Sequence, residues 1–473
     1  MFVPIPSSTN KGFSSNGHFA MSSQQAVPIK IYPRLTTGRF NNVRVFMVLA
    51  TQLVFFGLPW LQWNGRQAVH LDLEQHRFLI FGLTFWPQDF IFFAALLVIC
   101  ALGLFLWTAL AGRLWCGYSC PQTVYTQIML WIERLTLGDH NARRKLDAAP
   151  MNVNKFTRKT LAHGLMGLFS LITGFTLVGY FTPVRELAAA APSLAYGPWE
   201  SFWILFYGGF TWLLAGVLRE KVCLHMCPYA RFQGAMFDND TLIISYDNRR
   251  GEPRGKSKQA ADKARGSCID CGICVQVCPT GIDIRNGLQY ECIGCAACID
   301  ACDQVMDKIH APRGLIRYTS AAALEAAGKP NRPSSSHRPR VIVYSSLLAG
   351  IIALSTTALI LKKPFKVDVL RDRAVLVRAT DDGLLENSYN LKLINTSEQA
   401  QRFKIQVEGL PSLRLDKPGQ VVEVAPTQTE TVTVRVQAEP EHATRGAHDI
   451  YFVVSSLSHD GSMIREKSSF IGE

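Results

Sequence analysis

Apolar residues gather in five long runs in the chain up to residue 361. The runs lie at about 43–61, 90–111, 161–181, 202–218 and 341–361. Each is close to the roughly 20 residues that an α-helix needs to cross a bilayer. Tryptophans stand in or near the ends of the runs, as in the aromatic belt of membrane proteins. The sequence therefore predicts five membrane-spanning helices; for the fourth and shortest run, a buried core helix is the alternative.

After the fifth run the pattern changes to alternating apolar and polar residues. Period-two stretches, typical of strands with one buried face, occur at 365–370, 389–394, 403–407 and 431–436, and residues 450–454 are more continuously apolar. Turn-forming stretches such as Asp381–Gly383 and Lys417–Gly419 separate them. About seven short strands in this length favour an immunoglobulin-like β-sandwich, with a small barrel as the alternative.

The charge of the chain, +12 at neutral pH, is unevenly placed. Residues 362–473 hold 15 Lys and Arg against 16 Asp and Glu, so the basic excess lies in the rest of the chain. There it concentrates before the first run, in the loop 113–160 and after the fourth run. Basic loops mark the cytoplasmic side of a membrane. We therefore expect the N-terminus and the segment after the fourth run in the cytoplasm and residues 362–473 outside it, and we expect no nucleic-acid partner.

Eight of the 13 cysteines lie in one stretch between the fourth and fifth runs. They form two copies of C-x2-C-x2-C-x3-C, the spacing of bacterial two-cluster ferredoxins, in which the fourth cysteine of each copy binds the other cluster. The spacing assigns Cys268, Cys271, Cys274 and Cys302 to one [4Fe–4S] cluster, and Cys292, Cys295, Cys298 and Cys278 to the other. Zinc knuckles and disulfides are the alternatives, but zinc would need two pairs without a third cysteine in each run. Cys278 is followed by a proline and Cys302 by Asp303, a departure expected to alter the second cluster's surroundings without removing a ligand.

Two further cysteine pairs follow the second and fourth runs. They are Cys116 with Cys120 and Cys223 with Cys227, both in the pattern C-x3-C-P, and their repetition indicates an internal duplication. Proline disfavours helix in the residue before it and is welcome at the first helical position. Cys120 is therefore expected to cap a new amphipathic helix at 122–135, and Cys227 to do the same from residue 229. A thiol at a helix N-terminus near Arg or Lys is expected to be unusually acidic.

Four such thiols at one membrane depth predict a soft site suited to Cu(I), or dithiols that cycle with disulfides. They are the candidate catalytic and copper-binding residues. His225 and Met226, inside the second motif, are candidate extra copper ligands, with packing at the interface as the alternative. The alternative for the four cysteines is that they are small apolar fillers. Cys100, in the middle of the second run, is expected to be a packing residue.

Together these patterns predict a multi-domain membrane protein. It would combine a five-helix α transmembrane domain, an α+β two-[4Fe–4S] ferredoxin-like insert and a C-terminal all-β immunoglobulin-like sandwich. The expected parts are a flexible cytoplasmic tail at 1–38, four transmembrane helices with the first C-x3-C-P loop at 39–221, a cytoplasmic segment at 222–340 with the second motif and a ferredoxin core at 260–312, the fifth helix at 341–361, and the sandwich at 362–473. Residues 320–340 are expected to form a linker. The tail lacks the order of a cleaved signal peptide, and Met21 is an alternative start.

This ordered combination resembles the cytochrome c oxidase accessory proteins known as CcoG, FixG or Rdx, over residues 40–473. The resemblance implies a bacterial inner-membrane protein with a periplasmic C-terminal domain, which reduces Cu(II) to Cu(I) during assembly of the cbb(3)-type oxidase. It implies oxidase subunits and copper transporters or chaperones as partners, with Cys116, Cys120, Cys223 and Cys227 as the copper-linked residues. No G-x-G-x-x-G after a strand marks a flavin or nicotinamide site, so the electron donor is unidentified.

Two other functions fit parts of the pattern. NapH-like quinol dehydrogenase subunits also combine four spans, paired C-x3-C-P motifs and two clusters, and pass electrons to a periplasmic cytochrome. They generally lack the fifth span and the exported sandwich. In the third hypothesis the protein is a non-enzymatic oxidase assembly scaffold, whose sandwich holds oxidase subunits and whose clusters are structural or sensory; partner binding by the sandwich rests on fold-level analogy alone.

Overall fold

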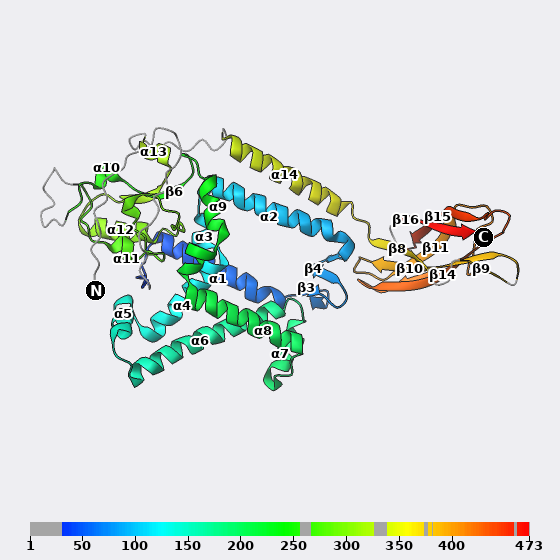
Figure 1. The fold of residues 1–473 in the computed structure, drawn as a ribbon, viewed down its shortest axis with the longest axis horizontal. Helices are drawn as coiled ribbons and strands as arrows, with labels where there is room; N and C mark the ends of the chain where they lie inside the picture. Colours follow the sequence, from blue (N-terminus) through cyan, green and yellow to red (C-terminus); the bar gives the residue numbers. More distant parts are fainter. Residues whose placement is uncertain are drawn as a thin grey trace. The chain divides into compact units, whose positions relative to one another are not determined.

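The computed structural model describes residues 31–255, 266–325, 338–372, 377–380, 382–457 and 461–472. The chain folds into two compact units, the first made of residues 1–60 and 95–352, and the second of residues 61–94 and 353–473 (Figure 1). Most of the expected N-terminal tail, the middle of the expected linker and the turn residue Asp381 lie outside the described residues. The first unit holds most of the helices and the cysteine-rich stretch, and the second holds the C-terminal strands.

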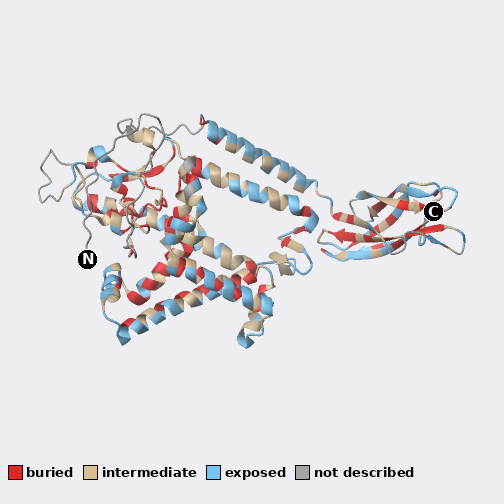
Figure 2. Cartoon of the chain, viewed as in Figure 1, coloured by how far each residue is buried: buried red, intermediate tan, exposed pale blue. Residues whose placement is uncertain are grey.

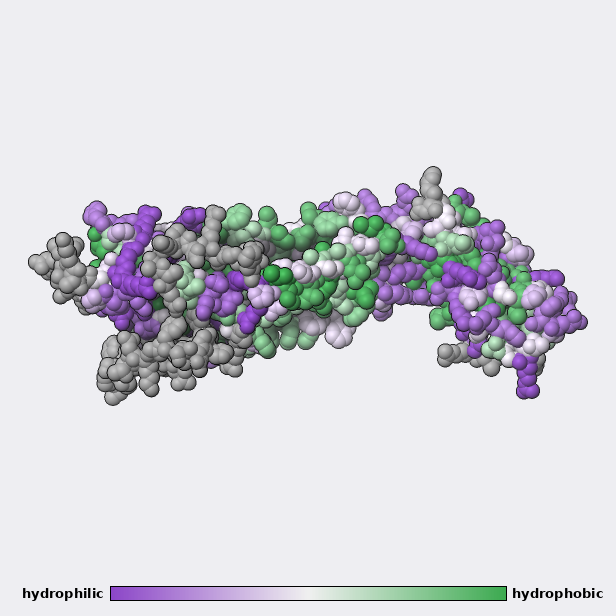
Figure 3. Space-filling view, turned by 90° about the horizontal axis from the view of Figure 1, so that it is seen from above, coloured by the Kyte–Doolittle hydropathy of each residue, from purple (hydrophilic) through white to green (hydrophobic). Residues whose placement is uncertain are grey.

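Within the described residues, five helices are long and apolar enough to cross a membrane, which confirms the prediction of five apolar helices. They are α1 (Arg39–Gly57), α2 (Phe90–Ala111), α6 (Val153–Val178), α8 (Pro198–Thr211) with its π-helical extension η4 (Trp212–Leu218), and α14 (Pro339–Ile360). Apolar side chains on them are widely exposed; Ile91 and Leu354, for example, each have 72 % of their surface exposed (Figure 2). The space-filling view shows dense apolar surface over the helical part (Figure 3). Leu205 of α8 is 64 % exposed, so the fourth run is not a buried core helix.

Two glycines set a close contact between α6 and α8. A Cβ atom added to Gly174 would lie 2.4 Å from the Ile204 carbonyl oxygen, and one added to Gly208 would lie 3.1 Å from the Ser170 carbonyl oxygen. Small residues allow membrane helices to approach this closely. Shorter helices complete the first unit's helical part: α3 (Leu114–Tyr118), α4 (Pro121–Leu137), α5 (His140–Ala148), α7 (Val184–Ala190) and α9 (Pro228–Met236).

The cysteine-rich stretch folds around an antiparallel strand pair, β6 (Ile243–Tyr246) and β7 (Ile316–Thr319). Four helices accompany it: α10 (Asn248–Gly251), α11 (Ile273–Gln276), α12 (Ala297–Lys308) and α13 (Ala321–Glu325). Ile244, Ile299 and Met306 form part of its buried core, and the cysteines of α11 and α12 lie in or against that core. The insert is therefore α+β, as predicted.

The C-terminal part is a sandwich of two antiparallel sheets, which confirms the predicted fold and excludes the barrel. One sheet has the order β12–β14–β10–β8, with β9 also on β10, and the other has the order β13–β11–β15–β16. The strands are β8 (Phe365–Arg371), β9 (Arg378–Ala379), β10 (Leu385–Asn395), β11 (Gln401–Glu408), β12 (Arg414–Leu415), β13 (Val421–Val424), β14 (Thr429–Ala438), β15 (Gly446–Ser456) and β16 (Met463–Gly472). Alternate residues such as Leu391, Phe403 and Phe452 point into one core because successive strand side chains face opposite sides.

The segment before the second span belongs to the same unit as the sandwich. It forms a hairpin of β1 (Gln62–Trp63) and β2 (Arg66–Gln67), and a three-stranded sheet of β3 (Val69–Asp72), β4 (Arg77–Ile80) and β5 (Leu83–Phe85). Arg77 donates a 2.7 Å hydrogen bond to the Thr427 carbonyl. The buried carboxylate of Asp89 accepts from Lys362 at 3.0 Å and from Lys366 at 2.7 Å. These contacts attach the segment to the sandwich.

Candidate functional site

The eight cysteines of the insert lie around two cavities. Cys268, Cys271, Cys274 and Cys302 line the first, and Cys278, Cys292, Cys295 and Cys298 line the second, which Cys274 also borders. These are the two sets that the spacing assigns. Because both cavities are almost wholly apolar apart from their thiols, the residues fit two [4Fe–4S] clusters. Cluster binding would require all eight thiols as thiolates, and the bound clusters would supply one-electron chemistry.

The two halves of the insert repeat the same backbone geometry. Asp270 and Gly272 in the first half have φ of 51° and 66°, and Gly294 and Ala296 in the second half have φ of 69° and 58°. Each pair flanks the second cysteine of its run, so the left-handed residues turn the chain around the cavity before α11 or α12 begins. Left-handed backbone suits glycine and costs a residue with a Cβ atom about 1 kcal/mol or more. The repetition shows that the turn is part of the cavity's construction.

The residue after Cys302 has a structural role of its own. The short helix α11 ends at Gln276, before Cys278 and its proline, whereas α12 continues past Cys302 to Lys308. Asp303, at the position of that proline, accepts a 2.9 Å hydrogen bond from the backbone N–H of Gly314. The departure from the ferredoxin pattern therefore lengthens the helix and ties it to the loop before β7.

The four C-x3-C-P thiols come from the two halves of the internal duplication. Cys116 lies on α3, Cys223 lies on the short π-helix η5 (Val222–Met226), and Cys120 and Cys227 are the N-cap residues of α4 and α9. Each thiol is close enough to the other three for their charges to interact. The new helices after Cys120 and Cys227, with proline at the first position, are confirmed.

The expectation of an unusually acidic thiol at a helix N-terminus is wrong for Cys120. Burial, and then the neighbouring thiols, raise the pKa of Cys116 to about 11 and the pKa of Cys223 to about 12. Burial also raises the pKa of Cys120, in spite of the backbone N–H groups at the start of α4. Removal from water penalises a thiolate more than a helix terminus favours it. A bound soft cation would reverse this balance, because it stabilises the thiolate directly.

The remaining candidates lie outside the thiol group. His225 and Met226 are exposed on η5, so the structure gives no support to their role as ligands. Cys100 is exposed on α2, so the prediction that it packs within the protein is wrong. Across the ranges that the structure describes, no three His, Cys, Asp or Glu side chains, the four C-x3-C-P thiols included, stand at the spacing of ligands to one metal ion, so three of these thiols could bind one copper ion only by moving closer together.

The two motifs are related by the same local geometry. Gly112 and Arg219, each four residues before the first cysteine of its motif, have φ of 57° and 47°. The residue after each proline also forms hydrogen bonds with the other half of the internal duplication. Gln122 donates to the Leu214 and Arg219 carbonyls at 2.8 and 3.1 Å, and the Tyr229 hydroxyl lies 2.8 Å from the Thr108 hydroxyl. These matching features support the internal duplication. They also show that each half of the duplication forms hydrogen bonds with the other.

The first motif lies directly against the loop of the second cysteine cavity. A Cβ atom added to Gly117 would be 2.8 Å from the Cα of Cys295 and 2.8 Å from the carbonyl oxygen of Gly294. Arg113 donates to the Cys292 carbonyl at 3.2 Å. Cys116 and Cys223 both pack against the small apolar cluster that contains Cys295. The thiol site thus adjoins the second cavity, a relationship that no sequence spacing encodes.

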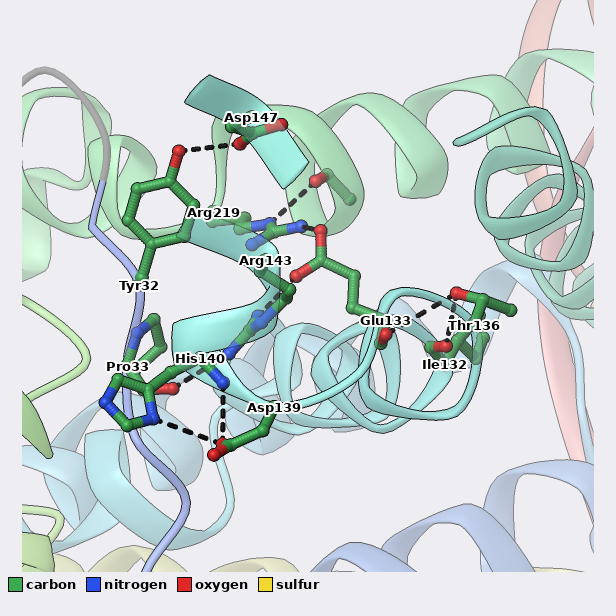
Figure 4. Close-up of polar contacts among 11 residues, drawn as sticks. Tyr32, Pro33, Ile132, Glu133, Thr136, Asp139, His140, Arg143, Asp147 and Arg219 are labelled. Carbon is green, nitrogen blue, oxygen red and sulfur yellow. Dashed lines mark hydrogen bonds and ion pairs between the residues drawn. The ribbon is translucent and has the colours of Figure 1, made fainter. Parts of the chain in front are cut away.

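A buried ion-pair cluster supports the second motif, and sequence reasoning missed it. Glu133 of α4 pairs with Arg143 of α5 at 2.6 Å and with Arg219 (Figure 4). Arg143 also donates to the Pro33 carbonyl at 2.9 Å. Burial by itself would raise the pKa of Glu133, but Arg219 and Arg143 hold it below the usual glutamate value. The sequence signal that could have predicted this cluster is an acidic residue in the predicted amphipathic helix, followed by a basic loop.

A pocket opens beside the second motif. Its walls include Arg44 of α1, Gln122, Thr123 and Thr126 of α4, Arg219 and Glu220 before the second motif, Cys223 of that motif, and Pro279, Thr280 and Ile293 of the insert. Thr280 lies 3.3 Å from the Cys278 sulfur. The Arg44 side chain is buried, and its Nε has no hydrogen-bond partner. The pocket therefore lies between Cys223 and residues that also line the second cavity, Thr280 and Ile293.

Comparison with known proteins agrees with this architecture. The 4Fe-4S dicluster domain family matches residues 218–321, a 4Fe-4S binding domain matches residues 93–137, and the family of the Ig-like fold at the C-terminus of FixG matches residues 355–473. A crystal structure of a FixG-related protein from Vibrio parahaemolyticus matches 24 % of this chain and 99 % of its own, at 27 % identity and a TM-score of 0.22.

Two curated relatives match most of the chain. The nitrogen fixation protein FixG of Rhizobium meliloti is 36 % identical over 88 % of this chain and 85 % of its own length. Protein RdxA of Cereibacter sphaeroides is 38 % identical over 81 % and 83 %. The ferredoxin-type protein NapH of Haemophilus influenzae is 24 % identical over 39 % of this chain and 66 % of its own. With these identities, this coverage and the fold described above, the chain belongs to the FixG/Rdx family of membrane iron–sulfur electron-transfer proteins.

Proposed function

We propose that this protein is a cupric reductase, which reduces Cu(II) to Cu(I) at Cys116, Cys120, Cys223 and Cys227. The Cu(I) would be used in assembly of a cbb(3)-type oxidase. Copper is the substrate here, and each reduction consumes one electron and leaves a Cu(I) ion on thiolate ligands. Thiolates favour Cu(I) over Cu(II), which raises the potential of the bound copper and assists the reduction.

One observation carries the proposal, namely the contact of Gly117 with the backbone of Cys295 and Gly294. It brings four soft ligands next to the second set of cluster cysteines, so a one-electron donor and a one-electron acceptor would be neighbours. Cys116 and Cys223, from different halves of the internal duplication, pack against the same apolar cluster at this contact. The buried surroundings limit access by water and by other electron acceptors.

The proposal includes a location and partners. The basic loops favour a cytoplasmic thiol site and cysteine-rich insert in a bacterial inner membrane, with the sandwich in the periplasm. Copper transporters or chaperones would then deliver or receive copper, and oxidase subunits would be the final recipients. Measuring the accessibility of single cysteines introduced at Glu74 and at Arg313 to a membrane-impermeant maleimide in intact cells tests this orientation; labelling at Arg313 and protection at Glu74 would contradict it.

Copper reduction can be measured directly. The full-length protein, with its clusters intact and reduced without oxygen, is mixed with Cu(II) and a Cu(I)-specific chelator. We expect rapid Cu(I) formation by the wild type and a large loss when Cys116, Cys120, Cys223 and Cys227 are all replaced by alanine. Cys100→Ala, which removes an exposed cysteine of α2, is the matched control and should behave as the wild type. Equal rates for the fourfold variant and the wild type would rule out the thiol site.

A quinol dehydrogenase subunit is the second candidate, and the pocket beside Cys223 is the observation that favours it. The pocket holds the buried guanidinium of Arg44, which would suit a ring carbonyl. Quinol-dependent reduction of a c-type cytochrome by the purified protein, unaffected by copper, would favour this function over copper reduction.

A further inference from the structure

The two first cysteines of the C-x3-C-P motifs have different surroundings in spite of the duplication. Gln233 of α9 is fully buried, and its amide nitrogen and oxygen lie 3.5 and 3.6 Å from the Cys116 sulfur. The oxygen can accept from the thiol, and the nitrogen can donate to a thiolate or to a metal-bound sulfur. One amide could therefore form a hydrogen bond with both the free and the metal-bound forms of Cys116 after only a small movement.

The other half of the duplication lacks this amide. Gln233 stands five residues after the proline of its motif, and the equivalent residue after Pro121 is Thr126. Thr126 accepts a 3.4 Å hydrogen bond from Gln122, and both residues line the pocket together with Cys223. Cys116 therefore lies beside a buried amide, whereas Cys223 lines an open pocket. Of the four thiols, Cys223 is the one among that pocket's lining residues.

The two surroundings would affect a bound metal differently. A hydrogen bond to a metal-bound sulfur holds it in place and tunes the metal's potential. A sulfur facing a pocket can instead be approached by an incoming ligand. Exchange of copper between carriers requires such an approach, because the incoming ligand must reach the metal before the outgoing ligand has left.

We propose that copper is taken up and released through Cys223, while Cys116, held by Gln233, remains bound to the metal between the two events. The inference rests on the proposed function. On uptake a Cu–S bond to Cys223 forms as the carrier's ligand leaves and the thiol proton passes to solvent. On release that bond breaks, the acceptor's ligand takes its place on Cu(I), and Cys223 regains a proton. No electron moves in either exchange.

The first test uses the full-length protein with clusters intact, in lipid nanodiscs under argon and without copper. It is treated with iodoacetamide, and the modified cysteines are followed by peptide mass spectrometry. We expect Cys223 to react faster than Cys116 in spite of its higher pKa, because the pocket gives the reagent access to Cys223 whereas the buried Gln233 covers the Cys116 sulfur. Gln233→Leu should lower the rate at Cys116, because the amide hydrogen bond that favours its thiolate is lost, and should leave Cys223 unchanged. Thr126→Val, at the equivalent position, should leave Cys116 unchanged. Equal rates in the wild type, or faster reaction at Cys116, would overturn the inference.

The second test follows transfer of Cu(I) from the loaded protein to a chelator. Cys223→Ser should slow the transfer and change the equilibrium affinity little, and Cys116→Ser should weaken the affinity. The reverse assignment would overturn the inference while leaving the proposed function in place. A wild-type protein that binds no Cu(I) in competition with the chelator would instead overturn the proposed function itself. The first test would still show which of Cys223 and Cys116 is alkylated faster.

Discussion

Gly117 touches the backbone of Cys295: a methyl group at position 117 would lie 2.8 Å from the Cys295 Cα. The contact joins a C-x3-C-P motif to a cluster loop that is far away in the sequence. Only hydrogen fits between these two backbones, so the closeness of the two sites depends on this glycine. The order of the motifs along the chain contains no hint of the contact.

Replacing Gly117 tests its importance. We expect Gly117→Ala to destabilise the protein by about 1–3 kcal/mol, because extra atoms in a packed site force the backbone apart. The melting temperature and the iron content after purification report the effect. Gly103→Ala on α2 is the matched control, since a Cβ atom there has no neighbour within 4 Å. A Gly117→Ala protein as stable as Gly103→Ala would contradict the close contact.

The interlaced cysteine sets make a prediction about iron content. Cys278 follows Cys274 in the sequence, but it lines the second cavity with Cys292, Cys295 and Cys298. Cys278→Ala and Cys292→Ala should therefore lose the same cluster, and Cys302→Ala and Cys268→Ala the other. Electron paramagnetic resonance of the reduced variants distinguishes the two losses. Identical spectra for Cys278→Ala and Cys268→Ala would show that the sorting is wrong.

Glu133 is expected to stabilise the second motif. Replacement by Gln leaves Arg143 and Arg219 without their buried counter-charge, and breaking a buried pair from one side costs about 3–5 kcal/mol. We expect a lower melting temperature and faster alkylation of Cys223, which follows Arg219 by four residues. Glu74→Gln, at an exposed glutamate, is the control. Unchanged stability of Glu133→Gln would mean that the cluster contributes little.

The same residue predicts a pH dependence. Since the folded protein holds the pKa of Glu133 below the usual value of 4.5, its stabilisation is fully present above that value. It is lost as the pH falls through the lower pKa of the folded state. The difference in unfolding free energy between the wild type and Glu133→Gln should therefore shrink on acidification. If the difference in unfolding free energy stays constant or grows as the pH falls below 4.5, the ion-pair assignment would be contradicted.

Asp89 is expected to hold the segment 61–94 onto the sandwich. Its side chain is 5 % exposed and lies between Lys362 and Lys366, so Asp89→Asn should loosen the segment by about 3 kcal/mol. Hydrogen exchange of residues 69–85 measures this loosening. Asp449→Asn removes a similarly short ion pair to Lys467, but both of its side chains are about 60 % exposed, so this substitution should have little effect. Equal effects of the two substitutions would argue against a special role for Asp89.

Local patterns in the sequence sufficed for the elements and for the two sets of cysteines that line the two cavities. A membrane span needs a long apolar run, a half-buried strand needs period-two alternation, and a two-cluster site needs a short cysteine spacing. These are properties of neighbouring residues. The start of α4 after Cys120 follows from Pro121 in the same way, because proline restricts the backbone of the residue before it. The acidity of the thiols did not follow, since it depends on burial by distant residues.

The family, the five apolar helices, the ferredoxin-like insert and the sandwich could all be inferred from the sequence, since each depends on contiguous residues. Which distant residues come into contact is known only from the folded protein: Gly117 with Cys295, Glu133 with Arg219, and Gln233 with Cys116. These contacts join segments from different parts of the chain, and packing chooses them from many possible pairs. For the same reason the difference between Cys116 and Cys223, two cysteines in the same motif, exists only in the folded protein.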